Sequence, residues 1–63
     1  MEVNKKLRKY LEDNGIKQSF LISVTGISQE KMSNIITGKR KITAEELSKI
    51  CIALNVSADL FLR

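Results

Sequence analysis

Residues 18–38 read QSFLISVTGISQEKMSNIITG, and this stretch decides the fold that the sequence predicts. It contains two apolar pairs whose members are three positions apart and so share one face of a helix: Leu21 with Val24, and Met32 with Ile35. Gly26 lies between the pairs, where a sharp turn requires a residue that tolerates positive φ. Ser28 follows, and its hydroxyl can accept a hydrogen bond from a free amide of the next helix. The stretch predicts helices over 18–25 and 29–36 joined by a tight turn, which is the helix-turn-helix unit.

The flanking sequence predicts three more helices. Residues 3–14 carry apolar side chains at helical spacing, and a glycine directly after them ends the segment. Thr43 and Glu46 have the spacing of a capping box, which starts a helix over 44–54. A serine caps a last short helix over 58–62. We therefore expect an all-α fold, a compact five-helix bundle.

The predicted core follows from the apolar faces of these helices. We expect the following side chains to be buried: Leu7, Leu11, Leu21, Val24, Ile27, Met32, Ile35, Leu47, Ile50, Cys51 and Leu54. Residues 1–63 are expected to form a single domain around this core, because a chain of this length supports no more than one.

The composition excludes several classes of protein. Histidine is absent and Cys51 is the one cysteine, so the sequence excludes a histidine-based catalytic dyad, a zinc site and an intramolecular disulfide. We expect no enzyme activity, no metal and no cofactor, and a reducing, cytoplasmic location. No apolar run reaches the roughly 18 residues of a membrane span, and no signal peptide is evident.

The net charge of +4 is unevenly distributed along the chain. Residues 28–41 hold four basic residues and one acidic residue, and residues 1–18 hold five basic and three acidic residues. Residues 42–63 hold two basic and three acidic residues. The basic excess flanks the predicted helix over 29–36, which favours a polyanionic partner, although small soluble domains often carry a net charge of this size.

Short motifs extend in a fixed order on both sides of the helix pair. Residues 15–18 read GIKQ, residues 38–40 read GKR, and residues 47–61 read LSKICIALNVSADLF. With the motif at 18–37, these segments resemble the phage repressor and Cro family of helix-turn-helix proteins, also called the XRE family. The resemblance implies a lambda-repressor-like fold and a sequence-specific transcriptional regulator. It also implies a repressor that binds a pseudo-palindromic operator in double-stranded DNA as a homodimer. A protein-interaction module of the same fold, such as an antitoxin or an accessory factor, is the alternative.

The resemblance also implies roles for individual side chains. The residues that would read base edges are Gln29, Glu30, Ser33 and Asn34. Amide side chains can pair with adenine in the major groove, and a carboxylate can accept a hydrogen bond from cytosine. The residues that would contact phosphates are Gln18, Lys31, Lys39, Arg40 and Lys41. A solvated polar helix face and a solvated basic loop are the alternatives for these two sets.

The chain departs from the family pattern at three positions. Leu11 and Ile36 stand where many members have an arginine and a glutamate that pair across the fold. Replacing a buried ion pair by apolar groups is often neutral or stabilising, so we expect both residues to be shielded from solvent. Ile22 stands where a small residue is usual, and it is expected to alter the angle between the two helices of the motif.

Apolar residues near the C-terminal end predict a dimer contact. They are Ile52, Leu60, Phe61 and Leu62. Ile52 lies about 140° from Leu47 around the helix axis and therefore off the buried stripe. Single exposed apolar residues are ordinary, so the prediction depends on their grouping. We expect no membrane partner and no small-molecule effector.

Overall fold

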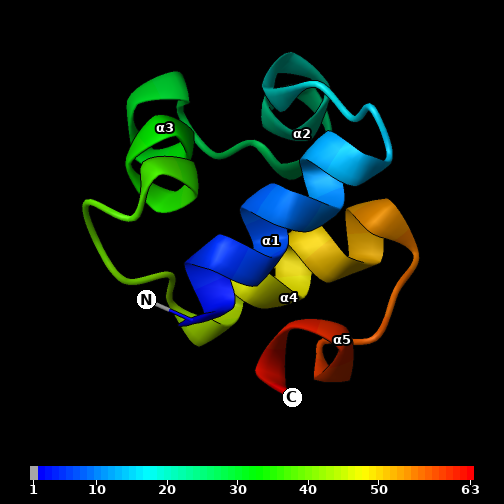
Figure 1. The fold of residues 1–63 in the computed structure, drawn as a ribbon. Coiled ribbons are helices and arrows are strands. Elements are labelled where there is room, and N and C mark those ends of the chain that lie inside the picture. The colour runs from blue at the N-terminus through cyan, green and yellow to red at the C-terminus, as the bar shows by residue number, and fades with distance from the viewer. Residues whose placement is uncertain (1) are drawn as a thin grey trace.

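The computed structural model describes residues 2–63, which form helices and no strand. The helices are α1 (Glu2–Asp13), α2 (Gln18–Thr25), α3 (Gln29–Thr37), α4 (Ala44–Leu54) and α5 (Asp59–Leu62). Figure 1 shows α2 and α3 on one side of the molecule and α5 on the other, with α1 and α4 between them. The expected all-α bundle is confirmed. None of the helices formed by residues 2–63 has the length and apolarity that a membrane crossing requires.

The capping signals in the sequence set most helix boundaries. Ser28 Oγ accepts a hydrogen bond from the Lys31 amide at 3.2 Å and starts α3. Thr43 and Glu46 form the predicted capping box at the start of α4, with reciprocal bonds of 3.1 and 3.0 Å. Gly26 ends α2 with φ +76°, a conformation that costs a residue with a Cβ about 1–2 kcal/mol. The turn of the motif is therefore specified locally.

Four helix boundaries differ from the prediction by one residue. α1 spans Glu2–Asp13 rather than 3–14, and α3 continues to Thr37. α5 begins at Asp59 rather than at residue 58, and the Ser57 hydroxyl accepts a hydrogen bond from the Asp59 amide at 3.3 Å.

One apolar core lies where the helices meet. Its buried apolar side chains are Leu7, Leu11, Leu21, Ile27, Met32, Ile35, Leu47, Ile50, Cys51 and Phe61. All of them except Phe61 belong to the predicted core. Burial raises the pKa of the Cys51 thiol, as expected of a core cysteine. Leu54 is half-buried and packs against this core rather than inside it. Leu11 is buried and Ile36 is half-buried against the core, so neither is solvent-exposed.

The prediction that Val24 is a core residue is wrong, because its side chain is 49% exposed. The inner face of α2 carries side chains spaced i, i+3, i+4 and i+7: Gln18, Leu21, Ile22 and Thr25. Around the helix axis, Val24 lies about 60° from Leu21, on the side away from Ile22 and Thr25. Phe20, one turn before Val24, is 47% exposed, so part of the outer face of α2 is apolar.

Phe61 is fully buried, so its predicted place in an exposed dimer contact is also wrong. Its ring packs edge-on against Tyr10, with the ring centroids 5.6 Å apart and an interplanar angle of 82°. α5 is a single turn with one inward-facing position, which Phe61 occupies, whereas Leu60 and Leu62 on either side of it are exposed. This aromatic pair attaches α5 to α1.

Candidate nucleic-acid interface

α3 presents a polar face that is anchored from behind by apolar side chains. Met32 and Ile35 are completely buried under α3. On the opposite side, Gln29 and Glu30 in the first turn are exposed, and Ser33 and Asn34 are half-buried. The four residues predicted to read bases therefore come from one helix, and the two in the first turn are the more accessible.

Thr37 extends this face by one turn and was not predicted as part of it. It is exposed, and its hydroxyl donates to the Ser33 carbonyl at 2.8 Å. Thr37 is seven residues after Glu30, so the two side chains lie within about 20° of each other around the helix axis. The i, i+7 spacing from Glu30 could have predicted the place of Thr37, but the helix was expected to end one residue earlier.

The turn between α2 and α3 is closed by a threonine as well as by Gly26. Thr25 Oγ1 donates to the Leu21 carbonyl at 2.6 Å and accepts from the Ile27 amide at 3.3 Å. Ile27 is buried in the core immediately after this turn. Because both ends of the turn are held, α3 keeps a defined position on α2.

The first turn of α2 begins the motif and lacks a side-chain cap. Lys17 occupies the N-cap position and makes no capping hydrogen bond. Gln18 is the first helical residue and is half-buried. The first amides of a helix lack intrahelical acceptors and favour an anion, so this end of α2 suits a phosphate group.

The basic residues near α3 fall into two groups. Lys31, Lys39 and Lys41 are exposed, and within residues 2–63 none of their ammonium groups lies within 4.0 Å of a carboxylate. Arg40 differs because both of its terminal nitrogens donate to the carboxylate of Glu46, one of them at 3.1 Å. The Arg40 guanidinium holds the pKa of the Glu46 carboxyl at about 2, and the same pairing raises the pKa of Arg40.

Asn4 is a buried polar residue that the sequence analysis did not single out. Its side chain is 1% exposed, and Nδ2 donates to the Ile35 carbonyl at 2.6 Å and to the Arg40 carbonyl at 3.0 Å. Asn4 Oδ1 has no hydrogen-bond donor among the residues that the structure describes. α1 is thereby joined to the last turn of α3 and to the basic loop that follows it.

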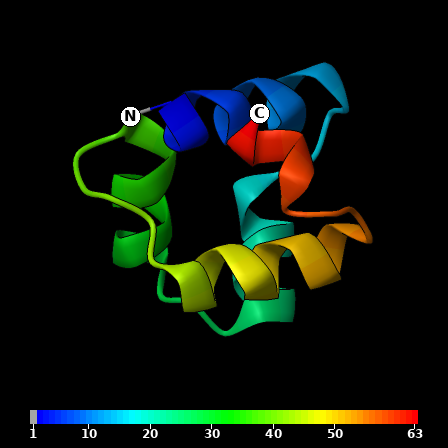
Figure 2. The same cartoon turned by 90° about the horizontal axis from the view of Figure 1, so that it is seen from below.

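Three of the four residues predicted as a dimer contact remain on the surface. Ile52 on α4 is 77% exposed, and Leu62 and Leu60 on α5 are 60% and 41% exposed. Figures 1 and 2 are related by a rotation about the horizontal axis, and both place α3 at one side of the molecule and the C-terminal end of α4 at the opposite side. The C-terminal end of α4, which carries Ile52, and the polar face of α3 therefore belong to different parts of the fold.

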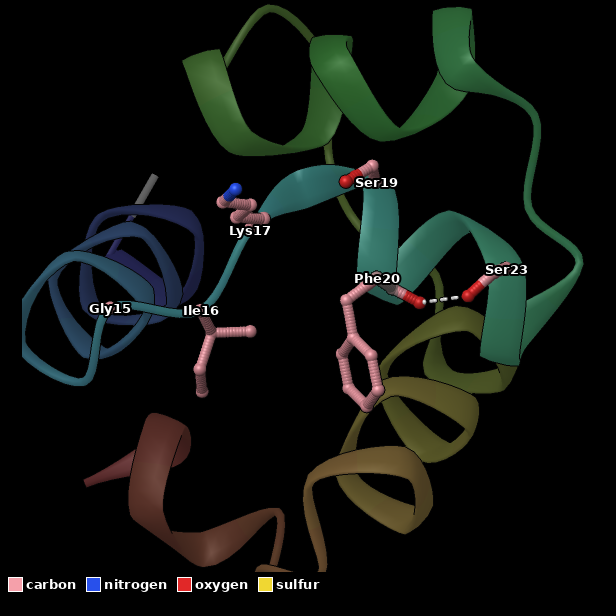
Figure 3. A pocket seen from close by; sticks show the side chains of 6 residues that line it. All are labelled: Gly15, Ile16, Lys17, Ser19, Phe20 and Ser23. Atoms are coloured by element: carbon pink, nitrogen blue, oxygen red, sulfur yellow. Dashed lines mark hydrogen bonds between the residues drawn. The ribbon is translucent and has the colours of Figure 1, made fainter.

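An open hollow of about 500 Å³ lies beside the start of α2. Its lining residues are Gly15, Ile16, Lys17, Ser19, Phe20 and Ser23. Figure 3 shows the side chains of Ile16 and Phe20 pointing to the same side, while Ser23 Oγ donates to the Phe20 carbonyl at 2.7 Å. Across residues 2–63, no three His, Cys, Asp or Glu side chains gather as a metal site would require.

The anchored helix pair, the polar outer face of α3 and the basic loop after it define a helix-turn-helix DNA-binding domain. The family model of the Cro/C1-type HTH DNA-binding domain matches residues 6–61, and the chain belongs to this family. Members of this family bind DNA and are not usually enzymes. Searches of curated proteins and of solved structures return no significant match.

Proposed function

We propose that this protein is a sequence-specific transcriptional regulator whose α3 enters the major groove of double-stranded DNA. The observation that carries the proposal is the arrangement of α3, which is fixed by two buried apolar side chains and turns a continuous polar face to solvent. A major groove about 12 Å wide accepts a helix, and every base pair presents a distinct donor and acceptor pattern there. Residues 1–63 act as one DNA-binding domain with its motif at 18–37.

Gln29, Glu30, Ser33 and Asn34 are the proposed base-reading residues. Gln29 and Asn34 lie about 140° apart around the helix axis, so they address different base pairs. The side chains of Glu30 and Ser33 fill the arc between them. An amide side chain can form two hydrogen bonds with adenine, and Glu30 can accept one from cytosine N4.

Phosphate contacts are assigned to Gln18, Lys31, Lys39 and Lys41. The three lysines are exposed and unpaired within residues 2–63, and Gln18 lies at an end of α2 whose amides are free of side-chain caps. Each phosphate neutralised changes the slope of log K against log salt by about −0.9. Three lysines therefore predict a slope of about −2.7 for one copy of the chain and about −5.4 for two.

We further propose a homodimer that binds a pseudo-palindromic operator and whose two copies meet through exposed apolar side chains of α4 and α5, namely Ile52, Leu60 and Leu62. Two reading helices must lie about 34 Å apart to enter successive major grooves on one face of the duplex. The Cα atoms of one copy span 26 Å along the longest axis, and α3 lies across the molecule from the C-terminal end of α4. Two copies joined on the side away from α3 can reach this spacing.

A repressor is the simplest regulator that such a molecule makes, because a dimer that covers an operator excludes other proteins from it. The proposed location is the cytoplasm, where the free thiol of buried Cys51 stays reduced.

The test is a selection of bound duplexes from a random pool, followed by a salt titration of binding to the selected duplex. The proposal predicts a selected sequence with two-fold symmetry and a steep loss of affinity as salt rises. A selection that enriches no sequence, or an affinity that does not depend on salt, would overturn it.

A second candidate function is a protein-interaction module of the same fold, such as an antitoxin or an accessory factor. It is favoured by the exposed apolar side chains of Phe20 and Val24 on the outer face of α2, because contiguous exposed apolar surface commonly marks a protein contact. Retention on heparin and on duplex DNA at low salt distinguishes the two functions. A protein-interaction module would pass through both columns, whereas a DNA-binding regulator would be retained.

A further inference from the structure

We propose that Arg40 is a positioning residue, and that Arg40, Glu46 and Asn4 together fix the 38–43 loop so that Lys39 and Lys41 face the phosphate backbone. This inference rests on the proposed function of the loop as a phosphate contact. It changes the role of Arg40, which the sequence suggested as a phosphate contact in its own right.

The first connection joins the loop to α4. The guanidinium of Arg40 makes two hydrogen bonds to the carboxylate of Glu46 and a third to the Lys41 carbonyl at 3.0 Å. The same carboxylate accepts from the Thr43 amide at 3.0 Å, at the far end of the loop. A planar, bidentate pair of this kind fixes direction as well as distance, so it holds the loop in one conformation.

The second connection joins the loop to α1 and α3. Asn4 donates from one nitrogen to the carbonyl of Ile35, in the last turn of α3, and to the carbonyl of Arg40 itself. The backbone of residue 40 is therefore held from α1 while its side chain is held from α4. Lys39 and Lys41, the neighbours of this doubly held residue, are both exposed.

Charge provides the argument against a direct phosphate contact by Arg40. Three of its five N–H donors are used inside the protein, and its charge is balanced by Glu46 at short range. A neutralised pair releases few counterions from DNA, whereas each of the two free lysines releases about one. Arg40 thus contributes to affinity through the position of its neighbours.

The test is Glu46→Gln, because Coulomb's law and the positioning role predict opposite changes in the affinity for duplex DNA. Removing a carboxylate from a protein that binds a polyanion should strengthen binding by charge alone. A positioning role predicts that binding to duplex DNA weakens on the order of tenfold, comparable to removing a hydrogen-bond partner that orients a metal ligand in a metal site. It also predicts a salt slope smaller in magnitude by up to about two units, because two lysines lose their place.

Glu45→Gln is the matched control. Glu45 lies in the same turn of α4, carries the same charge and, within residues 2–63, pairs only with Lys49 at 3.4 Å on the exposed side of the helix. Its substitution should leave affinity unchanged or slightly higher. If Glu46→Gln strengthens binding as Glu45→Gln does, the positioning role is refuted.

Two further variants are needed: Arg40→Ala, and the double variant that combines it with Glu46→Gln. Arg40→Ala should weaken binding about as much as Glu46→Gln, and the double variant should be no weaker than either, because the two side chains act as one unit. Equal amide exchange across residues 38–43 in wild type and Glu46→Gln would also refute the proposal, and this measurement needs no DNA. A wild type that fails to bind duplex DNA would instead refute the proposed function, and circular dichroism establishes that each variant is folded.

Discussion

Asn4 provides the sharpest test of how the fold holds α3 in place. Asn4→Ala removes the two hydrogen bonds that its Nδ2 makes to the carbonyls of Ile35 and Arg40. The Ile35 carbonyl keeps its bond from the Gly38 amide at 3.2 Å, so the Arg40 carbonyl is the group that loses most. At about 1 kcal/mol for each hydrogen bond, with a further term for the space left behind, the cost is about 2–3 kcal/mol.

The free energy of unfolding from urea titrations, together with Tm from circular dichroism, measures this cost. In a chain of this size, 1 kcal/mol corresponds to about 4–8 °C, so Tm should fall by about 10–20 °C. Asn4→Asp should be worse than Asn4→Ala, because an ionised carboxylate would face two carbonyl oxygens in a buried site. Asn14→Ala is the control, since Asn14 also donates to a carbonyl, that of Tyr10 at 2.8 Å, but is exposed.

Asn14→Ala should lose less than about 0.5 kcal/mol, because Asn14 is exposed. Equal losses for the two alanine variants would contradict the view that burial makes the Asn4 contacts costly to remove. A stable Asn4→Asp variant at neutral pH would contradict the assignment of Nδ2 as the donor.

Three further predictions follow from the charges and apolar surface. The pKa of Glu46 is about 2 in the fold, below its unfolded value, so its pair with Arg40 stabilises fully above about pH 4.5 and is lost as the pH falls toward 2. The free energy of unfolding should therefore fall less steeply with decreasing pH for Glu46→Gln than for wild type. Ile52→Asp should reduce self-association in sedimentation experiments and leave the monomer folded, whereas Val24→Asp, equally polar but on α2, should not. Glu30→Ala should raise affinity for a scrambled duplex, measured by fluorescence anisotropy, because it removes a negative charge from the DNA-facing side; an unchanged affinity would place Glu30 away from the DNA.

The local features of the fold were predictable because their causes are local. The cap at Ser28, the capping box of Thr43 and Glu46, and the left-handed residue at Gly26 all involve partners within four residues. Nine of the ten core residues were predicted, eight of them from helical periodicity and Ile27 as an apolar residue of the turn. The prediction for Val24 failed because two apolar residues three positions apart do not show which side of the pair packs against the core.

The supports of the candidate site were not predictable from spacing rules. Asn4 shares the i, i+3, i+7 face of Leu7 and Leu11, so its burial was readable, but its partners lie 31 and 36 residues away. The Arg40–Glu46 pair crosses from a loop to a helix, where the i, i+4 rule for helical ion pairs does not apply. Such contacts depend on how the helices pack, and periodicity carries no information about that.

The central claim is that the face of α3 reads base sequence, and alanine substitution at Gln29 and Asn34 tests it most directly. Each variant is titrated against the selected duplex and a scrambled one at a single salt concentration, with Ser48→Ala, on exposed α4 surface, as the control. We predict a loss of about 1–3 kcal/mol on the selected duplex for each α3 variant, roughly 5- to 150-fold in affinity, and almost none on the scrambled duplex. Equal weakening on both duplexes would contradict the assignment of α3 as the reading helix.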